Sequence, residues 1–404
     1  MNHKRHEKHE KKQLVPKLRF PEFRDKGEWQ ENELKQFLTE SRILGSKGNT
    51  AKKITVKLWG KGVFEKNDEI QGSINTQYYR RTTGQFIYSK LDFLNQAFGL
   101  IPEHLDSYES TVDLPCFDIS QGISPVFLLE YVKRKDFYEK LGETADGSRK
   151  ARRIHADTFL SFPIFMPSPQ EQQKIVDCLT TFDELITAEA GKLEAYKAHK
   201  KGLMQKLFPA EGETMPEWRF PEFRGKGEWE HYVINDIAKV TTGNKDTQNK
   251  FDDGEYPFFV RSQTVERINS YSYDGEAILT SGDGVGVGKN FHYIIGKFDF
   301  HQRVYCIYDF EKTVSGHFVY HYFTEHFYKR VMQLSAKNSV DSVRMAMITE
   351  MPISLPSNEE QQKITTCLSA LDNLITAQSK KIDTLKIHKK GLMQGLFPSA
   401  EVNI

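Results

Sequence analysis

One heptapeptide, HKKGLMQ, occurs twice in this chain of 404 residues, at 199–205 and again at 388–394. It lies within a longer repeat, because residues 167–212 align with residues 356–401 without a gap, at a constant offset of 189. A shorter motif also recurs, as LRFPEFRDKGEW at 18–29 and as WRFPEFRGKGEW at 218–229. Matches of this length do not arise by coincidence, so the chain contains an internal duplication. Any fold must place two copies of one frame around two intervening segments that do not resemble each other.

The long repeat predicts a helix in each copy. Ser168-Pro169-Gln170-Glu171 matches a capping box with proline at the first helical position, and Ser357-Asn358-Glu359-Glu360 repeats the box. Apolar residues then recur with a sustained period of about 3.5 residues, which is typical of a coiled-coil seam. The predicted seam comprises Ile175, Leu179, Phe182, Ile186, Leu193, Tyr196 and Leu203 in the first copy, and Ile364, Leu368, Leu371, Ile375, Ile382, Leu385 and Leu392 in the second.

Polar residues interrupt the seam at the same two steps in each copy, Glu189 and Lys200 in the first and Gln378 and Lys389 in the second. A polar residue in a seam costs stability but fixes the register of the partner. Two self-similar seams in one chain have each other as the obvious partner, so we expect an antiparallel pair about an internal two-fold axis. The alternative is that each helix packs only on its own neighbouring domain. Each helix of roughly 37 residues would be ~55 Å long.

The segments between the repeats predict two domains of short strands with a few helices, because they are rich in Phe, Tyr, Val, Ile, Gly and turn residues. The expected fold class is mixed α/β, with two globular domains separated by two long antiparallel coiled-coil helices. The expected boundaries are a disordered lead-in at 1–17, a first domain at 18–166, a central helix at 167–208, a linker at 209–217, a second domain at 218–355 and a C-terminal helix at 356–397.

Composition restricts the function only weakly. Lys and Arg number 56 against 55 Asp and Glu, so the total charge of +1 gives no strong basic field, although a basic stripe on one face stays possible. The four cysteines are scattered without zinc-ligand spacing. No apolar run approaches the ~20 residues that a membrane span needs. We therefore expect a reduced, cytoplasmic protein without a bound metal.

Catalytic motifs are absent from the sequence. There is no G-x-S-x-G, no H-E-x-x-H and no Asn-Pro-Pro-Tyr-like methyltransferase motif. The stretch GDGVGVGKN at 282–290 resembles a phosphate loop but fails its pattern, because Asp283 replaces the first glycine and Asn290 replaces the Ser or Thr. A glycine-rich loop whose backbone approaches a ligand closely is the better interpretation. The chain is expected to bind rather than to catalyse.

Both variable segments contain clusters with the chemistry of DNA recognition. Arg and Lys can reach phosphates or guanine edges, Gln and Asn can pair with adenine, and Tyr can stack. A single cluster of this kind is typical of a solvated surface, but clusters in both segments favour a DNA-facing groove. The candidates are Gln77, Tyr79, Arg80, Arg81, Lys133, Arg134, Arg149 and Arg153 in the first segment, and Lys245, Arg261, Gln263, Lys289, Arg303, Lys337 and Arg344 in the second.

The repeated arrangement resembles the specificity subunit of type I restriction-modification enzymes. The resemblance rests on the RFPEFR…GEW motif, the EQQKI helix start and the HKKGLMQ helix end, each present twice, and it covers nearly the full chain. The segment 273–305 also resembles a target-recognition domain of that family. The resemblance implies that each variable domain reads one half of an asymmetric, bipartite site in double-stranded DNA, while the helices set the unspecified spacer.

The same resemblance implies the partners and cofactors. Two copies of a DNA methyltransferase subunit would dock on the helices, and motor-nuclease restriction subunits would join for cleavage. S-adenosylmethionine, ATP and Mg would belong to these subunits, and this chain would bind no cofactor. A ~55 Å helix spans at most ~16 base pairs. The duplicated heptapeptide makes Lys200, Lys201, Gly202, Lys389, Lys390 and Gly391 the candidate docking residues, since a glycine inside a helix costs roughly 1 kcal/mol relative to alanine.

Three other functions stay open at this point. The chain could be a stand-alone two-headed DNA-binding or architectural protein without methyltransferase partners. It could be an enzyme that fuses recognition with methylation or cleavage, although the missing motifs argue against this. It could also be a coiled-coil adaptor whose heads bind something other than DNA.

Overall fold

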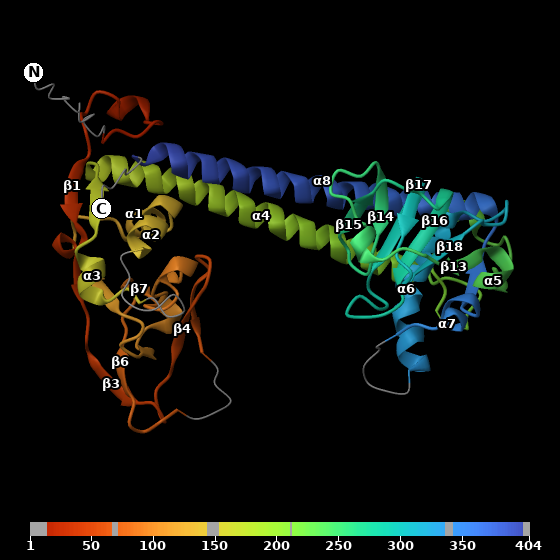
Figure 1. Cartoon of the computed structure of the whole chain (residues 1–404), viewed down its shortest axis with the longest axis horizontal. Coiled ribbons are helices and arrows are strands. Elements are labelled where there is room, and N and C mark those ends of the chain that lie inside the picture. Colours follow the sequence, from red (N-terminus) through yellow and green to blue (C-terminus); the bar gives the residue numbers. More distant parts are fainter. Residues whose placement is uncertain (1–13, 67–71, 144–152, 211, 336–341, 399–404) are drawn as a thin grey trace, which may run out of the picture. The chain divides into compact units, whose positions relative to one another are not determined.

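The computed structural model describes residues 14–66, 72–143, 153–210, 212–335 and 342–398 (Figure 1). The chain forms two compact units, one built from residues 1–188 and 381–404 and the other from residues 189–380. Each unit therefore contains one variable domain together with one half of each long helix. These helices are α4 (Pro169–Leu207) and α8 (Asn358–Leu396).

The variable domain of the first unit is built from small sheets rather than from one large sheet. Its central four-stranded sheet has the order β2-β10-β7-β8, and β3, β6 and β9 form a three-stranded sheet beside the hairpin β4–β5. The strands are β2 (Leu38–Glu40), β3 (Leu44–Lys47), β4 (Ile54–Lys57), β5 (Gly62–Glu65), β6 (Gln77–Arg80), β7 (Phe86–Tyr88), β8 (Phe98–Leu100), β9 (Glu109–Ser110) and β10 (Cys116–Ile119). The helices are α1 (Pro125–Val132), α2 (Lys135–Gly142) and α3 (Ala156–Leu160), with short 3₁₀ turns at Leu34–Gln36, Phe93–Asn95 and Glu103–Leu105.

Aromatic side chains fill the core of this domain. Phe86 stacks on Phe159 with ring centroids 5.5 Å apart, and Tyr88 stacks on Phe117 at 6.0 Å. All three residues of β7 are buried, which occurs when both faces of a strand are covered. The many aromatic side chains of the segment thus pack in the core of a small domain, where large rings bury the most apolar area per residue.

The variable domain of the second unit is organised around one six-stranded sheet of order β13-β18-β16-β17-β14-β15. All neighbours pair antiparallel except β14 and β17, which are parallel. The strands are β13 (Lys239–Thr242), β14 (Tyr256–Phe259), β15 (Val265–Ile268), β16 (Tyr273–Ser281), β17 (Phe291–Phe300) and β18 (Val304–Tyr308). The helices are α5 (Ile234–Ile237), α6 (Gly316–Leu334) and α7 (Met345–Thr349), and Thr247–Asn249 forms a 3₁₀ turn.

The recurring short motif has the same structure in both units. Each copy contains a 3₁₀ turn, at Pro21–Phe23 or Pro221–Phe223, and leads into an antiparallel two-stranded ladder. In the first unit β1 (Gln30–Glu33) pairs with β11 (Pro163–Met166), and in the second β12 (Glu230–Val233) pairs with β19 (Pro352–Leu355). The ladder closes each variable domain at its base, because it joins the segment that enters the domain to the segment that leaves it.

A buried arginine ties each motif to the start of a long helix. Arg19 donates from Nε to Glu171 Oε1 at 2.7 Å and from Nη2 to Oε2 at 2.8 Å. Arg219 makes the same two-pronged contact with Glu360, at 2.7 and 2.6 Å. We refer to these two contacts as the arginine staples. A buried, bidentate guanidinium–carboxylate pair fixes geometry well, because both hydrogen bonds must form together.

The predicted capping boxes form only in part, because the staples engage their glutamates. Ser168 Oγ does accept from the Glu171 backbone N–H at 3.3 Å, and Ser357 Oγ accepts from Glu360 at 3.4 Å. The two glutamate carboxylates, however, are held by the staple arginines rather than by the serine backbone. The helix start is thus only half a capping box, and the glutamate serves a long-range contact instead.

Inside each unit the two long helices run antiparallel. In the first unit Lys389 Nζ lies 2.7 Å from Asp183 Oδ2, and in the second Lys200 Nζ lies 2.6 Å from Asp372 Oδ1. These two ion pairs are equivalent, because each residue of one pair lies 189 positions from its counterpart in the other. The residues predicted for the seam are all buried or half-buried. The polar seam residues Glu189 and Gln378 meet directly, with Gln378 Nε2 donating to Glu189 Oε2 at 2.6 Å.

The predicted lead-in is partly wrong. Residues 1–13 lie outside the described residues, but residues 14–17 belong to the first unit. Leu14 packs against the core, and its carbonyl accepts from the Trp29 backbone N–H at 2.9 Å. The folded part of the first unit therefore includes residues that precede the repeated motif.

Candidate nucleic-acid interface

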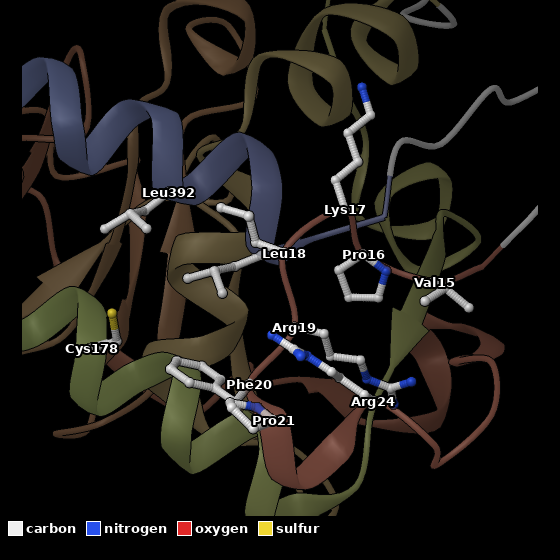
Figure 2. Close-up of a pocket in the computed structure, with 11 residues that line it drawn as sticks. Val15, Pro16, Lys17, Leu18, Arg19, Phe20, Pro21, Arg24, Cys178 and Leu392 are labelled. Atoms are coloured by element: carbon white, nitrogen blue, oxygen red, sulfur yellow. The ribbon is translucent and has the colours of Figure 1, made fainter.

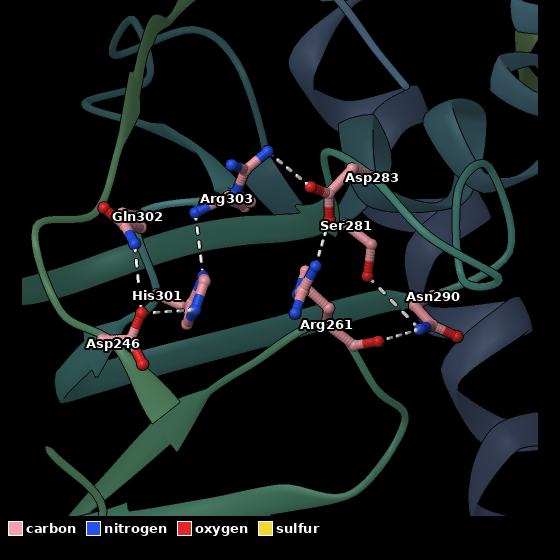
Figure 3. A network of polar contacts seen from close by, with 8 residues as sticks. All are labelled: Asp246, Arg261, Ser281, Asp283, Asn290, His301, Gln302 and Arg303. Atoms are coloured by element: carbon pink, nitrogen blue, oxygen red, sulfur yellow. Dashed lines mark hydrogen bonds and ion pairs between the residues drawn. The ribbon is translucent and has the colours of Figure 1, made fainter. Parts of the chain in front are cut away.

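The second unit brings several predicted DNA-binding residues together beside strand ends of its six-stranded sheet (Figure 3). Asp283, just after β16, receives Arg261 Nη1 on Oδ1 and Arg303 Nη1 on Oδ2, both at 2.8 Å. Arg261 follows β14 and Arg303 precedes β18, so three separate strand ends meet here. We call this group the Asp283 cluster.

The cluster presents its arginines to solvent. The side chains of Arg261 and Arg303 stay 44% and 62% exposed, whereas that of Asp283 is only 17% exposed. Each arginine uses one Nη atom for the ion pair, which leaves the outer part of both guanidinium groups facing outward. An aspartate that orients two arginines in this way spaces two cations at a set distance, as phosphate or guanine recognition requires.

The electrostatics of the cluster keep Asp283 charged and His301 neutral. Burial raises the pKa of Asp283, but hydrogen bonds from Arg261 and Arg303 outweigh it, so the pKa lies below its ordinary value. Burial, with the charge of Arg261 added, lowers the pKa of His301. His301 Nδ1 accepts from the Arg303 backbone N–H at 2.9 Å, which places the proton of the neutral ring on Nε2.

The glycine-rich loop 282–290 lies against this cluster. Gly286 is closely packed, because a Cβ there would lie 1.9 Å from Asn290 Nδ2 and would displace that side chain. Asn290 in turn donates to the carbonyl of Arg261 at 3.2 Å. Val287 is buried at 4% exposure, whereas Val285 at the apex is 97% exposed. The loop is thus a turn that packs against the cluster.

The remaining candidates of the second unit lie near the same place. Gln263 donates to the carbonyl of Lys289 at 3.0 Å, and Lys245 forms an isolated bridge with His301. Arg344 is exposed and follows Val343, whose backbone N–H donates to the Gly282 carbonyl at 2.7 Å. Lys337 lies outside the described residues. Sequence reasoning therefore chose residues in this unit that the fold brings together.

In the first unit the same reasoning was wrong for two arginines. Arg81 is 2% exposed and donates to Ser110 Oγ and to the Ser41 carbonyl, both at 2.8 Å. Arg134 is also buried, and its Nη1 donates to the Pro398 carbonyl at 3.1 Å while its guanidinium lies 4.1 Å from the Tyr131 ring. Both side chains hold the fold together and do not face a ligand.

The other candidates of the first unit are mixed. Gln77 is half-buried, and its amide donates to the carbonyls of Gly45 and Tyr78 at 3.0 and 2.8 Å. Tyr79 is half-buried and Arg80 is exposed on the same strand, β6. Arg153 is exposed, Lys133 pairs with Glu130 at 3.0 Å, and Arg149 lies outside the described residues. The structure does not gather these residues into one cluster.

The hairpin β4–β5 carries a feature that the sequence reasoning missed. Its turn presents Trp59, which is 60% exposed and has a left-handed backbone with φ of 61°. Lys57 and Lys61 flank it, and Gly60 lies over the side chain of Lys133. The signal in the sequence is an aromatic residue between lysines in a turn, K-L-W-G-K at 57–61.

The predicted docking residues lie at equivalent places in the two units. Lys200 and Lys389 are engaged in the helix–helix ion pairs described above, whereas Lys201 and Lys390 are exposed. No atom lies within 4 Å of the place that a Cβ would take at Gly202 or Gly391. The chain's own packing therefore does not require glycine at either position.

A hollow of about 570 Å³ lies beside this helix end in the first unit (Figure 2). Its lining includes Leu18 and Phe20 from the short motif, Cys178 from α4 and Leu392 from α8. Most of the lining is apolar, and it combines residues of both repeated blocks. Within the described residues no group of His, Cys, Asp and Glu could hold a metal ion, and no helix is long and apolar enough to cross a membrane.

A family model for the type I restriction modification DNA specificity domain matches residues 132–197 and 226–386, which together are more than half of the chain. The chain belongs to this family. The prediction made from the repeated motifs is thereby confirmed.

Curated relatives agree with this assignment. The chain is 29% identical over 173 residues to the type I restriction enzyme EcoDI specificity subunit of Escherichia coli, an alignment that covers 43% of this chain and 38% of that protein. It is 25% identical over 269 residues to the MjaVIII specificity subunit of Methanocaldococcus jannaschii, which covers 59% of this chain and 62% of the relative. The chain thus spans less than two thirds of the length of these relatives.

Solved structures show the same fold. The type I restriction-modification S subunit from M. genitalium superposes with a TM-score of 0.61 at 13% identity, covering 96% of this chain and all of that chain. A chain from a structure that addresses complex assembly and conformational transition of a type I system superposes with a TM-score of 0.58 at 13% identity, covering 92% of this chain and 98% of that chain. The predicted fold class, with two sheet-containing domains and long helices, is confirmed.

Proposed function

We propose that this chain is the DNA-binding specificity subunit of a type I restriction-modification complex, and that each variable domain reads one half of a bipartite DNA site. The observation that carries the proposal is the duplicated frame around two unlike domains. The same arginine staple and the same ladder support a set of small sheets in one unit and a six-stranded sheet in the other. A chain that repeats its frame and varies its heads is organised to present two different recognition surfaces.

The proposed site is asymmetric because the two recognition surfaces have different chemistry. The second domain offers the exposed, oriented arginines of the Asp283 cluster, which suit phosphate oxygens or guanine edges. The first domain offers an exposed tryptophan turn and the exposed Arg80. Two surfaces with different donors and stacking groups do not select the same bases.

The long helices set the spacer between the half-sites and dock the partners in this proposal. Each helix start is stapled to its own domain, so a change in the length of a helix moves a domain along DNA. Two copies of a DNA methyltransferase subunit dock on the equivalent faces around Lys201 and Lys390, where Gly202 and Gly391 leave room for a partner backbone. Motor-nuclease subunits join the assembly for cleavage.

The chemistry of the complex belongs to the partners in the same proposal. This chain recognises DNA and is not itself catalytic, whereas S-adenosylmethionine, ATP and Mg are bound by the methyltransferase and motor subunits. The chain's own residues supply position, since they decide which base is held near the partner's active site.

The decisive experiment is co-expression with candidate methyltransferase subunits, followed by mapping of methylated bases on genomic DNA. The expected result is a stable complex that methylates a two-part motif with a fixed gap. Replacing residues 30–166 by another domain of the family should change one half-site only, and a change in both would contradict the modular reading. Inserting four residues, about one turn, into α4 should alter the gap or abolish assembly.

A stand-alone DNA-binding protein gives a different result in the same experiment. In that case the purified chain binds duplex DNA tightly, no methyltransferase subunit co-purifies, and no motif is methylated. If neither the chain nor a complex binds any duplex, the DNA-recognition function itself is wrong.

A further inference from the structure

The first variable domain contains a strained, exposed tryptophan in a hairpin turn. Trp59 and Gly60 are consecutive residues with left-handed backbones, φ 61° and 65°, in the four-residue turn between β4 and β5. Two consecutive left-handed residues in a hairpin turn are the usual place for Asn-Gly, because a large L side chain is disfavoured there. Tryptophan is among the least expected residues at such a position.

The turn is held in this conformation by a second turn. The Trp59 backbone N–H donates to the Asn95 carbonyl at 2.7 Å, and the Gly60 N–H donates to the Gln96 carbonyl at 2.9 Å. Gln96 is itself left-handed, with φ of 54°. Strained residues persist where the surrounding structure fixes them, and such residues concentrate at functional sites. The backbone around Trp59 is thus fixed before any ligand arrives.

The hairpin is anchored at its base and open at its tip. Val56 and Val63 are buried in a small apolar cluster with Ile87 and Cys116. By contrast, Trp59 keeps 60% of its surface exposed, more than any other tryptophan of the chain. An exposed indole on a rigid support loses little conformational entropy when it contacts a partner, which makes it a good binding anchor.

Lysines lie near the tip, and one of them contacts another ring of the hairpin, since Lys57 Nζ lies 4.0 Å from the centre of the Phe64 ring. Lys57 and Lys61 lie on either side of Trp59 in sequence, and both are exposed. The aliphatic part of Lys133 passes beneath Gly60, with its Cε 3.4 Å from the place that a Cβ would take, and its ammonium group pairs with Glu130 at 3.0 Å. An aromatic face among lysines matches a nucleic acid, whose bases stack and whose phosphates need neutralising.

We propose that Trp59 is a specificity-determining wedge of the first domain, which stacks its indole on a nucleobase and unstacks one base step of the first half-site. This inference rests on the proposed DNA-recognition function and assigns a residue and a mode of contact to it. Lys57 and Lys61 neutralise the phosphates that flank the opened step. Flexible pyrimidine–purine steps cost the least to open, so the wedge favours such a step without hydrogen bonds to it.

The test compares complexes of the full chain with its methyltransferase subunits on a duplex that carries the mapped site. In the wild type, stacking on a base should quench tryptophan emission when the cognate duplex is added. Trp59→Phe should keep the affinity within about threefold and lose the difference in quenching, because phenylalanine still stacks but does not emit in this range. Trp59→Ala should weaken binding by about 5- to 150-fold.

A second variant separates a wedge from a structural role. Trp59→Asn suits the left-handed position, so it should leave the melting temperature unchanged or raise it while it weakens binding as Trp59→Ala does. A variant that loses both stability and affinity would show that Trp59 only holds the hairpin. Ile295→Ala is the control, since Ile295 is an apolar residue of the other domain with 71% exposure and should leave binding unchanged.

The position of the wedge is read with 2-aminopurine placed at successive steps of the duplex. Its emission should rise at one step of the first half-site with the wild-type complex and stay low with Trp59→Ala. The proposal is overturned if no step of the first half-site is brighter with the wild-type complex than with Trp59→Ala, or if Trp59→Ala binds like the wild type. A wild-type complex that binds no duplex overturns the proposed function as well.

Discussion

The two variable domains use arginine in opposite ways. In the second, Arg261 and Arg303 point outward and are oriented by one aspartate. In the first, Arg81 and Arg134 are buried and donate to backbone carbonyls of their own unit. Both pairs come from sequence clusters of the same polar and basic character. A cationic cluster in a sequence therefore indicates an arginine with a hydrogen-bonding task, but not whether the acceptor is DNA or the protein itself.

A second difference concerns the apolar residue that each domain exposes at a turn. The first presents Trp59 on a strained hairpin turn, and the second presents Val285 at the apex of a glycine-rich loop. The tryptophan offers a π face for stacking, whereas valine offers only methyl groups. These two turns therefore present different apolar chemistry to solvent.

Removing a buried arginine should have the largest effect on stability. Arg81→Met should lower the free energy of unfolding of the first unit by about 2–4 kcal/mol, because it leaves buried carbonyl and hydroxyl partners unsatisfied. The measurement is urea unfolding followed by hydrogen exchange in peptides of that unit. Arg80→Met, at the neighbouring exposed position, is the control and should change stability by less than about 0.5 kcal/mol. Equal effects of the two variants would show that Arg81 is not a structural residue.

Removing an exposed arginine should have the reverse profile. Arg303→Ala should leave the stability of the second unit within about 0.5 kcal/mol of the wild type. It should weaken binding of the complex to its cognate duplex by about 1–3 kcal/mol, since Arg303 would contact a phosphate or a base edge. Equilibrium binding at several salt concentrations measures this loss.

The companion variant Asp283→Asn tests whether Asp283 orients the two arginines for DNA binding. It removes the negative charge that orients both arginines, so binding to unrelated duplexes should become tighter while discrimination between sites falls. If Arg303→Ala binds DNA normally, the Asp283 cluster is not part of the interface.

The contact between Glu189 and Gln378, which stand at equivalent positions of the two repeats, can be tested by a charge change. Gln378→Glu buries a second carboxylate against Glu189, and the like charges should raise the pKa of one of them. Since a raised carboxyl pKa favours the protonated folded state, the variant should be most stable below about pH 4 and should lose about 1–3 kcal/mol as pH rises to neutrality. Thermal unfolding across pH, with the wild type as reference, checks this. A variant without this pH dependence would contradict direct contact between the two residues.

A buried histidine should make the second unit less stable than the first in acid. His321 of α6 is fully buried, both its ring nitrogens lack hydrogen-bond partners in the described structure, and burial with the nearby Lys200 charge lowers its pKa to about 2. The unfolded chain binds a proton there below its ordinary pKa near 6.5, so the stability of the second unit should fall by about 1.4 kcal/mol per pH unit below that value.

The first unit has no such group among its described histidines, since His104, His155 and His388 are exposed. Hydrogen exchange at pH 7.0 and 5.5 should therefore show destabilisation of the second unit in particular. His321→Phe should reduce this difference, and the remainder should come from His292, His301 and His317, whose pKa values burial also lowers. An unchanged difference in that variant would assign the acid sensitivity to these other groups.

Much of this molecule could be predicted from the sequence because the information is local or repeated. The 3.5-residue period predicts the two helices, and α4 and α8 begin and end within two residues of the expected bounds. Helical periodicity depends on residues three and four apart, so it is visible in one segment. The duplication needs only a comparison of the chain with itself, and the family followed from the repeated motifs.

Only the tertiary structure decided which side chains are buried and which are exposed. Glu171 has the spacing of a capping-box residue, yet it pairs with Arg19, 152 positions away. The buried Arg134 donates to a carbonyl 264 positions away. The left-handed conformation of Trp59 is fixed by hydrogen bonds to a separate turn at Asn95. Burial, ion pairing and strain depend on which distant segments meet, and no local pattern records that. The sequence by itself determined the frame and its repetition, whereas long-range packing determined where that frame exposes the groups that can read DNA.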